Sequence, residues 1–320
     1  MNVLVTGGNG FVGRELVKRL LAQASILPDD RALTQLTVVD VGCEHLPDDP
    51  RLRFVSGSIA DSAVLEAALE VPADLVFHLA SIPGGAAERQ FELGLQVNLC
   101  ATLELFQRLA RQGNRPRVVF TSTIAVYGSA LPALVDDTSP LRPDMSYGAH
   151  KLVGEILLAD YSRRGALDGR IVRLPGIVAR PPEPSGLLSA FMSDLFWKLA
   201  AGDTFTCPVS EQAVAWWMSV GCCAENLLHA ASLSPELVAD RRAYTLPVLR
   251  LTVGQVVDGL CERFGQDRRS LVRYQADAKL ESAFGKLPAL DASAAETLGF
   301  RHDGNVMTLI ENAMAWRQPC

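Results

Sequence analysis

The sequence of 320 residues contains few cysteines and histidines, and none in the spacings that hold metals or disulfides. Its seven cysteines are odd in number and form no CxxC pair, and its five histidines form no HExxH pair. Unpaired thiols in such a set are typical of reduced proteins of the cytoplasm. We therefore expect no metal site and no disulfide framework.

Long apolar runs and runs of like charge are also missing. No apolar segment reaches the roughly 18 residues that a membrane span needs, and an apolar strand that begins at Asn2 leaves no room for a signal peptide. The net charge of −6 and the pI near 5.5 give no basic surface for nucleic acid. These absences predict a soluble cytoplasmic protein whose partners include neither nucleic acid nor a membrane.

What is present is an alternation of apolar strands and helices. We expect strands over 2–7, 36–40, 53–59, 73–81, 116–128 and 169–179, and helices over 9–23, 63–70, 91–113 and 146–165. Strands that are apolar on both faces and alternate with helices are typical of a parallel sheet covered on both sides. The pattern predicts an α/β fold with a doubly wound parallel sheet.

The composition changes at the proline-rich stretch 179–186, which cannot be the interior of a helix. We expect a dinucleotide-binding domain over 1–178 and a smaller substrate-binding part over 179–320. A helix and a strand expected within 219–247 return this segment to the first domain, so the two parts are interleaved.

A glycine turn joins the first strand to the first helix. Gly7, Gly10 and Gly13 form GxxGxxG, which lets backbone N–H groups at a helix start face a pyrophosphate. Asp40 ends the second strand, 27 residues after Gly13. A carboxylate there accepts hydrogen bonds from ribose hydroxyls and repels a 2′-phosphate, which favours NAD over NADP. A solvated acid at a strand end is the alternative for Asp40.

The stretch "YGAHK" contains Tyr147 and Lys151, which share one face of a helix at i, i+4 spacing. Thr123 ends the fifth strand, at the edge of the sheet where ligands bind in doubly wound folds. A nearby ammonium favours phenolate, so Tyr147 could accept the proton of an alcohol as hydride leaves the carbon. The three side chains predict hydride transfer.

These residues carry a resemblance to the extended short-chain dehydrogenase/reductase superfamily, which includes NAD-dependent epimerases and dehydratases. The matching stretches are "TGGNGFVG", Asp40, "FHLAS", Asn98, "STIAVYG" and "YGAHK". The resemblance implies a Rossmann fold, Tyr147 as the acid/base, Lys151 as its tuner and ribose ligand, and Thr123 or Ser122 as the catalytic hydroxyl. Further cofactor contacts that it implies are Phe11, Val12, Ser58, Ile59, Leu79, Ala80, Ser81, Asn98, Pro175, Gly176 and Ile177. It also implies a homodimer formed through the helices that contain Tyr147 and Asn98.

Two features of the nucleotide-sugar members of this superfamily are absent. Gly176 stands where those enzymes have an asparagine that contacts the diphosphate, and Ala215–Trp216 replaces an Arg-Asp pair. The stretches "RLPGIVARP" and "CPV…WWMS…AENLLHA" are instead similar to the D-erythronate dehydrogenase branch. That branch implies NAD-dependent oxidation of C2 of a sugar acid to a 2-oxo acid. A nucleotide-sugar 4-epimerase or 4,6-dehydratase, and an NAD-binding regulatory protein, remain alternatives.

A small sugar acid needs a cation for its carboxylate, and Arg180, just after the sixth strand, is the first candidate, with Arg89 weaker. Both have the alternative of a solvated loop arginine. Several other conspicuous residues are expected to be structural. This group contains His78, His150, Trp216, Trp217, Met218, Cys222, Cys223 and, as an alternative to cofactor binding, Asn98.

Overall fold

The computed structural model describes residues 1–23, 31–182 and 187–315, and its largest element is a sheet of seven parallel strands. The strands are β1 (Asn2–Thr6), β2 (Gln35–Asp40), β3 (Leu52–Ser56), β4 (Leu75–His78), β5 (Arg117–Thr123), β7 (Asp168–Leu174) and β11 (Ala243–Thr245). Their order is β11-β7-β5-β4-β1-β2-β3. The chain leaves β1 toward β3 and returns on its other side at β4, which creates a topological switch point between β1 and β4. This confirms the predicted doubly wound parallel sheet.

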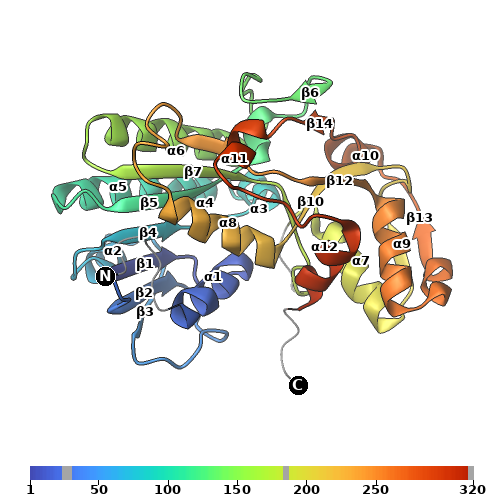
Figure 1. Cartoon of the computed structure of the whole chain (residues 1–320), viewed down its shortest axis with the longest axis horizontal. Helices are drawn as coiled ribbons and strands as arrows, with labels where there is room; N and C mark the ends of the chain where they lie inside the picture. Colours follow the sequence, from blue (N-terminus) through green and yellow to red (C-terminus); the bar gives the residue numbers. More distant parts are fainter. Residues whose placement is uncertain (24–30, 183–186, 316–320) are drawn as a thin grey trace.

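Helices cover both faces of this sheet (Figure 1). On one face lie α1 (Phe11–Ala22) and α8 (Val220–Ser232), which pack on each other and on the strands. On the other face lie α2 (Ser62–Ala68), α5 (Ala101–Arg111) and α6 (Ser146–Arg163). Leu16, Val17 and Leu20 are fully buried on α1 because their helical spacing gives that helix one apolar face.

A smaller part, on the right of Figure 1, has its own core. It is built on a three-stranded sheet of β8 (Gly176–Val178), β10 (Val214–Ser219) and β12 (Leu249–Thr252). Three helices pack in this core, namely α7 (Ala190–Ala201), α9 (Val253–Phe264) and α12 (Val306–Met314). Shorter elements are β6 (Leu134–Val135), β9 (Phe205–Cys207), β13 (Val272–Tyr274), β14 (Ala289–Leu290), α10 (Ala278–Phe284), α11 (Ser293–Thr297) and η3 (Gln266–Leu271).

The strands expected over 53–59 and 73–81 end earlier, at Ser56 and His78, and three further predicted elements are interrupted. The strand expected over 169–179 divides at Pro175, because proline has no N–H for the ladder, and β8 joins the smaller sheet. The strand expected over 116–128 ends at Thr123, whose hydroxyl accepts from the backbone N of Ala125 at 3.1 Å and opens the 3₁₀ turn η2 (Ile124–Tyr127). The helix expected over 91–113 contains α4 (Phe91–Leu95) and a π-helical turn, η1 (Gln96–Cys100), before α5.

The domain division at residue 178 stays a proposal. The strand β11 pairs with β7, so the segment expected to return to the first domain has a strand in the large sheet. The strand β8 pairs with β10 in the smaller sheet, which would place the domain boundary at Pro175. Residues 183–186 of the proline-rich stretch lie outside the described residues.

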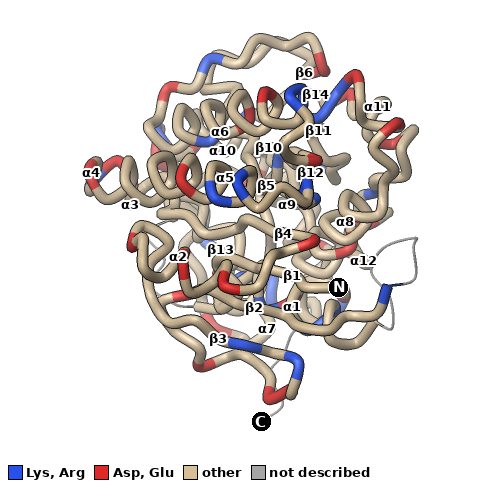
Figure 2. The backbone as a smooth tube through the Cα atoms, turned by 90° about the vertical axis from the view of Figure 1, so that its left-hand side faces the viewer, with Lys and Arg blue, Asp and Glu red and all other residues tan. Residues whose placement is uncertain are grey.

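The residues expected to be structural are buried. Trp216, Trp217 and Met218 are 0–1% exposed, and Cys222 and Cys223 lie in the core between α8 and the large sheet. Figure 2 shows basic and acidic residues interspersed along the chain. None of the described helices is both long enough and apolar enough to cross a membrane.

Candidate active site

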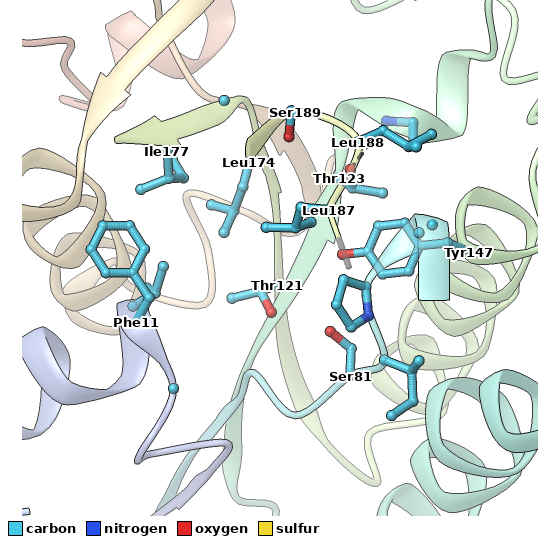
Figure 3. A pocket seen from close by; sticks show the side chains of 18 of the residues that line it. Phe11, Ser81, Thr121, Thr123, Tyr147, Leu174, Ile177, Leu187, Leu188 and Ser189 are labelled. Carbon is cyan, nitrogen blue, oxygen red and sulfur yellow. Dashed lines mark hydrogen bonds between the residues drawn. The ribbon is translucent and has the colours of Figure 1, made fainter. Parts of the chain in front are cut away.

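A cavity of about 790 Å³ lies between the carboxyl ends of the large sheet's strands and the smaller part (Figure 3). It collects most of the residues that the sequence predicts for the site. These are Gly7, Gly10, Phe11, Val12, Gly13, Asp40, Ser58, Ile59, Leu79, Ala80, Ser81, Ser122, Thr123, Tyr147, Pro175, Gly176, Ile177 and Arg180. Parallel strands place their carboxyl ends on one edge, so residues far apart in the sequence meet there.

The glycine turn forms one end of the cavity. Gly7 has φ +74°, and a Cβ on it would lie 2.7 Å from the backbone N of Ala80. A Cβ on Gly13 would collide with the carbonyl oxygen of Gly7. Gly10 caps α1 without a side-chain hydrogen bond, which leaves the helix start open to an anion. Side chains would fill this cradle, so the turn fits the pyrophosphate of a dinucleotide.

Asp40 is held against the same turn. Its Oδ2 accepts from the backbone N of Asn9 at 2.8 Å, and its Oδ1 accepts from the backbone N of Val41 at 2.7 Å. The Asn9 side chain in turn donates to Glu44 at 3.0 Å and accepts from the backbone N of His45 at 3.1 Å. The carboxylate is therefore fixed at the cavity rather than solvated at a free strand end. The sequence did not predict that the backbone of Asn9 holds Asp40.

The loop after β4 is held in place by buried polar side chains. Asn98 accepts from the backbone N of Ile82 at 2.7 Å and donates to its carbonyl oxygen at 3.0 Å. His78 bridges two threonine hydroxyls, Thr6 at 2.7 Å and Thr102 at 2.8 Å, and burial lowers its pKa to about 3. Asn98 does not line the cavity. Its contacts are those of a structural residue that shapes the loop carrying Leu79, Ala80 and Ser81.

Tyr147 is on the first turn of α6, and its hydroxyl points into the cavity beside Ser81 (Figure 3). Burial raises the pKa of Tyr147, while a hydrogen bond with Ser81 and the charge of Arg180 act in the opposite direction. A bound cofactor adds a positive nicotinamide ring, which also favours phenolate.

Lys151 lies beneath this tyrosine rather than on the cavity wall. Its Nζ donates to the carbonyl oxygen of Thr121 at 2.8 Å and lies 5.9 Å from the centroid of the Tyr147 ring. Burial lowers the pKa of Lys151 to about 7, against the opposing charge of Glu155. The predicted pair is thus brought together by one helix.

The two candidate hydroxyls at the end of β5 have different environments. Ser122 is 2% exposed and donates its hydroxyl to the carboxylate of Glu155. Thr123 is partly exposed and lies on the same side of the cavity as Tyr147 (Figure 3). The arrangement favours Thr123 as the hydroxyl that meets a substrate, because Ser122 already donates its hydroxyl proton to Glu155, whereas the Thr123 hydroxyl acts as an acceptor from the backbone N of Ala125.

Arg180 stands at the other side of the cavity. Its guanidinium carbon lies 4.9 Å from the centroid of the Phe11 ring, and its backbone is held by Ser193 at 3.0 Å and Trp197 at 2.6 Å. Among the described residues that line the cavity, Arg180 is the one Lys or Arg. Arg89 lies in α3 (Gly84–Arg89) and is not part of the lining.

Several lining residues were not predicted. Leu187, Leu188 and Ser189 pass close to Tyr147 and Thr123 (Figure 3), and Met192 and Trp216 also line the cavity. No motif marks these positions. They follow the proline-rich stretch or belong to the second sheet, so only the folded chain brings them to the site.

Comparisons with known proteins identify the family of this chain. The sequence profile of the NAD-dependent epimerase/dehydratase family matches residues 3–231. D-erythronate dehydrogenases of Cupriavidus necator and Haemophilus influenzae are 38% and 32% identical, over 98% and 97% of this chain and 98% of each relative.

Solved structures give the same result for the fold. That of a nucleoside-diphosphate-sugar epimerase from Agrobacterium tumefaciens is 32% identical, with a TM-score of 0.89 over 97% of this chain and 92% of that chain. An L-threonine dehydrogenase from Cupriavidus necator has a TM-score of 0.84 at 21% identity, over 98% of this chain and 99% of that chain, which shows the fold alone.

Proposed function

The chain belongs to the NAD-dependent epimerase/dehydratase family, and from this premise we propose that it oxidises the C2 hydroxyl of D-erythronate to a 2-oxo acid. The enzyme is an NAD-dependent oxidoreductase of the extended short-chain dehydrogenase/reductase type. The observation that carries the substrate proposal is the meeting of Tyr147, Thr123 and Arg180 at one cavity. The names of the two bacterial relatives supply the identity of the acid.

The residues of the chain divide the work as follows. Gly7, Gly10 and Gly13 would hold the pyrophosphate, and Asp40 would hold the adenosine ribose. The bound cofactor supplies the acceptor for a hydride. Thr123 orients the C2 oxygen, and Tyr147 takes the hydroxyl proton as the C2–H bond breaks. Lys151 would reach the nicotinamide ribose from beneath Tyr147, and its ammonium form would lower the pKa of the phenol.

Arg180 binds the substrate carboxylate in this proposal. Its guanidinium presents paired donors that match a carboxylate. The hydrogen bonds of its backbone with Ser193 and Trp197 fix the main chain at Arg180. The stacking on Phe11 restricts the position of the guanidinium. The cation thereby lies across the cavity from the tyrosine, which would place C2 between the two.

A nucleotide-sugar is the second candidate, because the similar Agrobacterium structure is named as an epimerase of such compounds. The surroundings of Gly176 argue against it. A Cβ at Gly176 would lie 2.7 Å from the terminal methyl of Met192 and 2.9 Å from the carbonyl oxygen of Trp216, so an asparagine does not fit there. Trp216 itself is buried and donates to the carbonyl oxygen of Pro288 at 2.8 Å. A diphosphate would lack both of its expected partners.

An assay with a panel of substrates tests the proposal. Purified protein with NAD is offered four- to six-carbon sugar acids and, separately, UDP-, GDP- and dTDP-sugars. We expect net NADH with D-erythronate and no product from the nucleotide-sugars. Conversion of a nucleotide-sugar without net NADH would contradict the proposed substrate, since an epimerase regenerates its cofactor. NAD binding with no turnover of any compound would favour a regulatory protein.

We also propose that the enzyme is a homodimer formed through α6 and the helices around η1. Ile156 and Val153 on α6 are 61% and 39% exposed, and Phe91 and Leu93 on α4 are 49% and 43% exposed. Burying such apolar side chains in a symmetric interface is favourable. Light scattering should give twice the chain mass, and Ile156→Lys should give a monomer. A wild-type mass equal to one chain would contradict the proposal.

A further inference from the structure

A buried ion pair lies beneath the helix that carries Tyr147 and Lys151. Glu155, one turn beyond Lys151 on α6, is 5% exposed at its side chain, and Arg173 on β7 is 9% exposed. Arg173 Nε donates to Glu155 Oε1 at 3.0 Å, and Nη2 donates to Oε2 at 2.7 Å. The Ser122 hydroxyl donates to the same Oε1. The Glu155 carboxylate is thus held by a guanidinium that donates to both of its oxygens and by the Ser122 hydroxyl.

Arg173 is itself held on its other side. Its Nη1 donates to the Tyr127 hydroxyl at 3.2 Å, and that hydroxyl is hydrogen-bonded to Thr245 at 2.7 Å. Tyr127 comes from the 3₁₀ turn after β5 and Thr245 from β11. Four separate elements therefore fix the position of one carboxylate below the site.

Lys151 has the spacing to bind Glu155 but does not. The two residues are i, i+4 on α6, the spacing at which a lysine and a glutamate commonly pair. Within the described part of the chain, no carboxylate lies within ion-pair distance of Lys151 Nζ. Its contacts are the carbonyl oxygen of Thr121 at 2.8 Å and the Phe120 ring, with its centroid at 4.8 Å.

The other charged or titratable groups around Lys151 cannot replace Glu155 as its counter-ion. His78, from β4, carries no negative charge, and burial keeps its pKa at about 3. Glu88, from α3, accepts from the backbone N of Ser146 at the start of α6 and acts on His150. Arg180, across the cavity, acts on Tyr147. Glu155 is the group whose charge opposes the effect of burial on Lys151.

We propose that Arg173 is a positioning residue that, with Ser122, holds Glu155 away from Lys151 and so keeps the lysine ammonium directed at the tyrosine and the cofactor. Without that grip, the carboxylate swings to the nearest cation, Lys151, and cancels its field at Tyr147. The tyrosine then becomes a weaker acid and is active as a base only at higher pH. This inference rests on the proposed roles of Tyr147 and Lys151.

The test is the pKa of Lys151 in Arg173→Gln. In the protein without cofactor, burial holds this pKa at about 7, and the charge of Glu155 raises it. The pKa is followed by NMR of protein with labelled lysine side chains, and the Lys151 signal is assigned with Lys151→Met. An opposite charge at 4–6 Å shifts a pKa by about 1–3 units, so we expect the Lys151 pKa to rise by about one unit as Glu155 pairs with it. The acid limb of kcat/KM against pH should move upward, and Kd for NAD should increase severalfold.

A second variant distinguishes positioning from general damage. In Glu155→Gln/Arg173→Gln no carboxylate is left to bind Lys151, so the Lys151 pKa should return to its wild-type position or below. Arg170→Gln is the matched control, because Arg170 lies three residues earlier on β7 and is buried in an ion pair with Asp168. It should lower the melting temperature and leave the Lys151 pKa unchanged.

Two results would overturn the inference. One is a Lys151 pKa in Arg173→Gln equal to that in Arg170→Gln, and the other is a rise of this pKa that persists in the double variant. If Arg173→Gln does not fold, Arg173→Lys, which keeps one charge but loses the two-pronged grip, carries the test with the same expected direction. Failure of the proposed function would appear separately, as substantial turnover by Tyr147→Phe, and would leave the titration result standing.

Discussion

The Nζ of Lys151 lies 5.9 Å from the centroid of the Tyr147 ring, one helical turn along α6, and donates to the carbonyl oxygen of Thr121. This places an ammonium beneath the phenol whose hydroxyl faces the cavity. The relationship connects the fold to the chemistry, because a parallel sheet ends at the cavity and one helix supplies both groups.

Removing the phenolic hydroxyl should stop turnover without emptying the cofactor site. Proton transfer by a positioned side chain contributes about 10²–10⁴-fold, so Tyr147→Phe should lower kcat by at least 100-fold. The Kd for NAD, measured by calorimetry, should change by less than about threefold, because the aromatic ring stays in place. Tyr161→Phe, on the same helix but away from the cavity, is the control and should keep wild-type kcat.

Loss of Asp40 should weaken the preference for NAD over NADP. The carboxylate accepts from the backbone N groups of Asn9 and Val41, which orients it toward the ribose hydroxyls and against a 2′-phosphate. In Asp40→Ala, the ratio of the Kd for NADP to the Kd for NAD should fall by about tenfold or more, equivalent to about 1.4 kcal/mol in relative binding free energy. The exposed Asp48→Ala should leave the ratio unchanged. An unchanged ratio in Asp40→Ala would show that another group recognises the ribose.

Arg180→Gln should raise KM for the sugar acid more than it lowers kcat. Charge-assisted hydrogen bonds contribute about 1.5–3 kcal/mol, which corresponds to an increase in KM of about tenfold or more. Arg89→Gln is the matched control, since Arg89 does not line the cavity. Equal KM values for the two variants would remove Arg180 from the carboxylate site.

Stability should respond to pH through Lys151. Burial lowers its pKa from 10.5 in the unfolded chain to about 7 in the folded protein. Between these values the unfolded state binds more protons, so this lysine makes the free energy of unfolding rise with pH, by at most about 1.4 kcal/mol per pH unit. Urea titrations give the free energy of unfolding of wild type and of Lys151→Met at pH 7 and at pH 9. The wild-type value minus the variant value should therefore be larger at pH 9 than at pH 7. A difference that is the same at both pH values would mean that Lys151 is not titrating in this window.

The sequence predicts those parts of the site that depend on local geometry. The glycine turn requires Gly7 and Gly13 because a Cβ at either meets neighbouring backbone, and the Tyr147–Lys151 spacing needs only one helix. Strand ends in a parallel sheet then bring Asp40 and Thr123 to the same edge without further information.

The remaining features depend on contacts distant in sequence. Pro175 ends β7 locally, but the pairing of β8 with β10 in the smaller sheet depends on residues far along the chain. The engagement of Ser122 depends on Glu155 and Arg173, which lie 33 and 51 residues later in the chain. The approach of Leu187 and Leu188 to Tyr147 has no motif behind it. Such features appear only when the two parts of the chain are packed together.

The most direct test of the central claim follows the hydrogen at C2. D-erythronate carrying deuterium at C2 is incubated with the enzyme and NAD, and the cofactor and the acid are analysed by mass spectrometry. The account predicts reduced cofactor with one deuterium and an equal amount of the unlabelled 2-oxo acid. Unlabelled reduced cofactor, or no reduced cofactor at all while a nucleotide-sugar is converted, would contradict it.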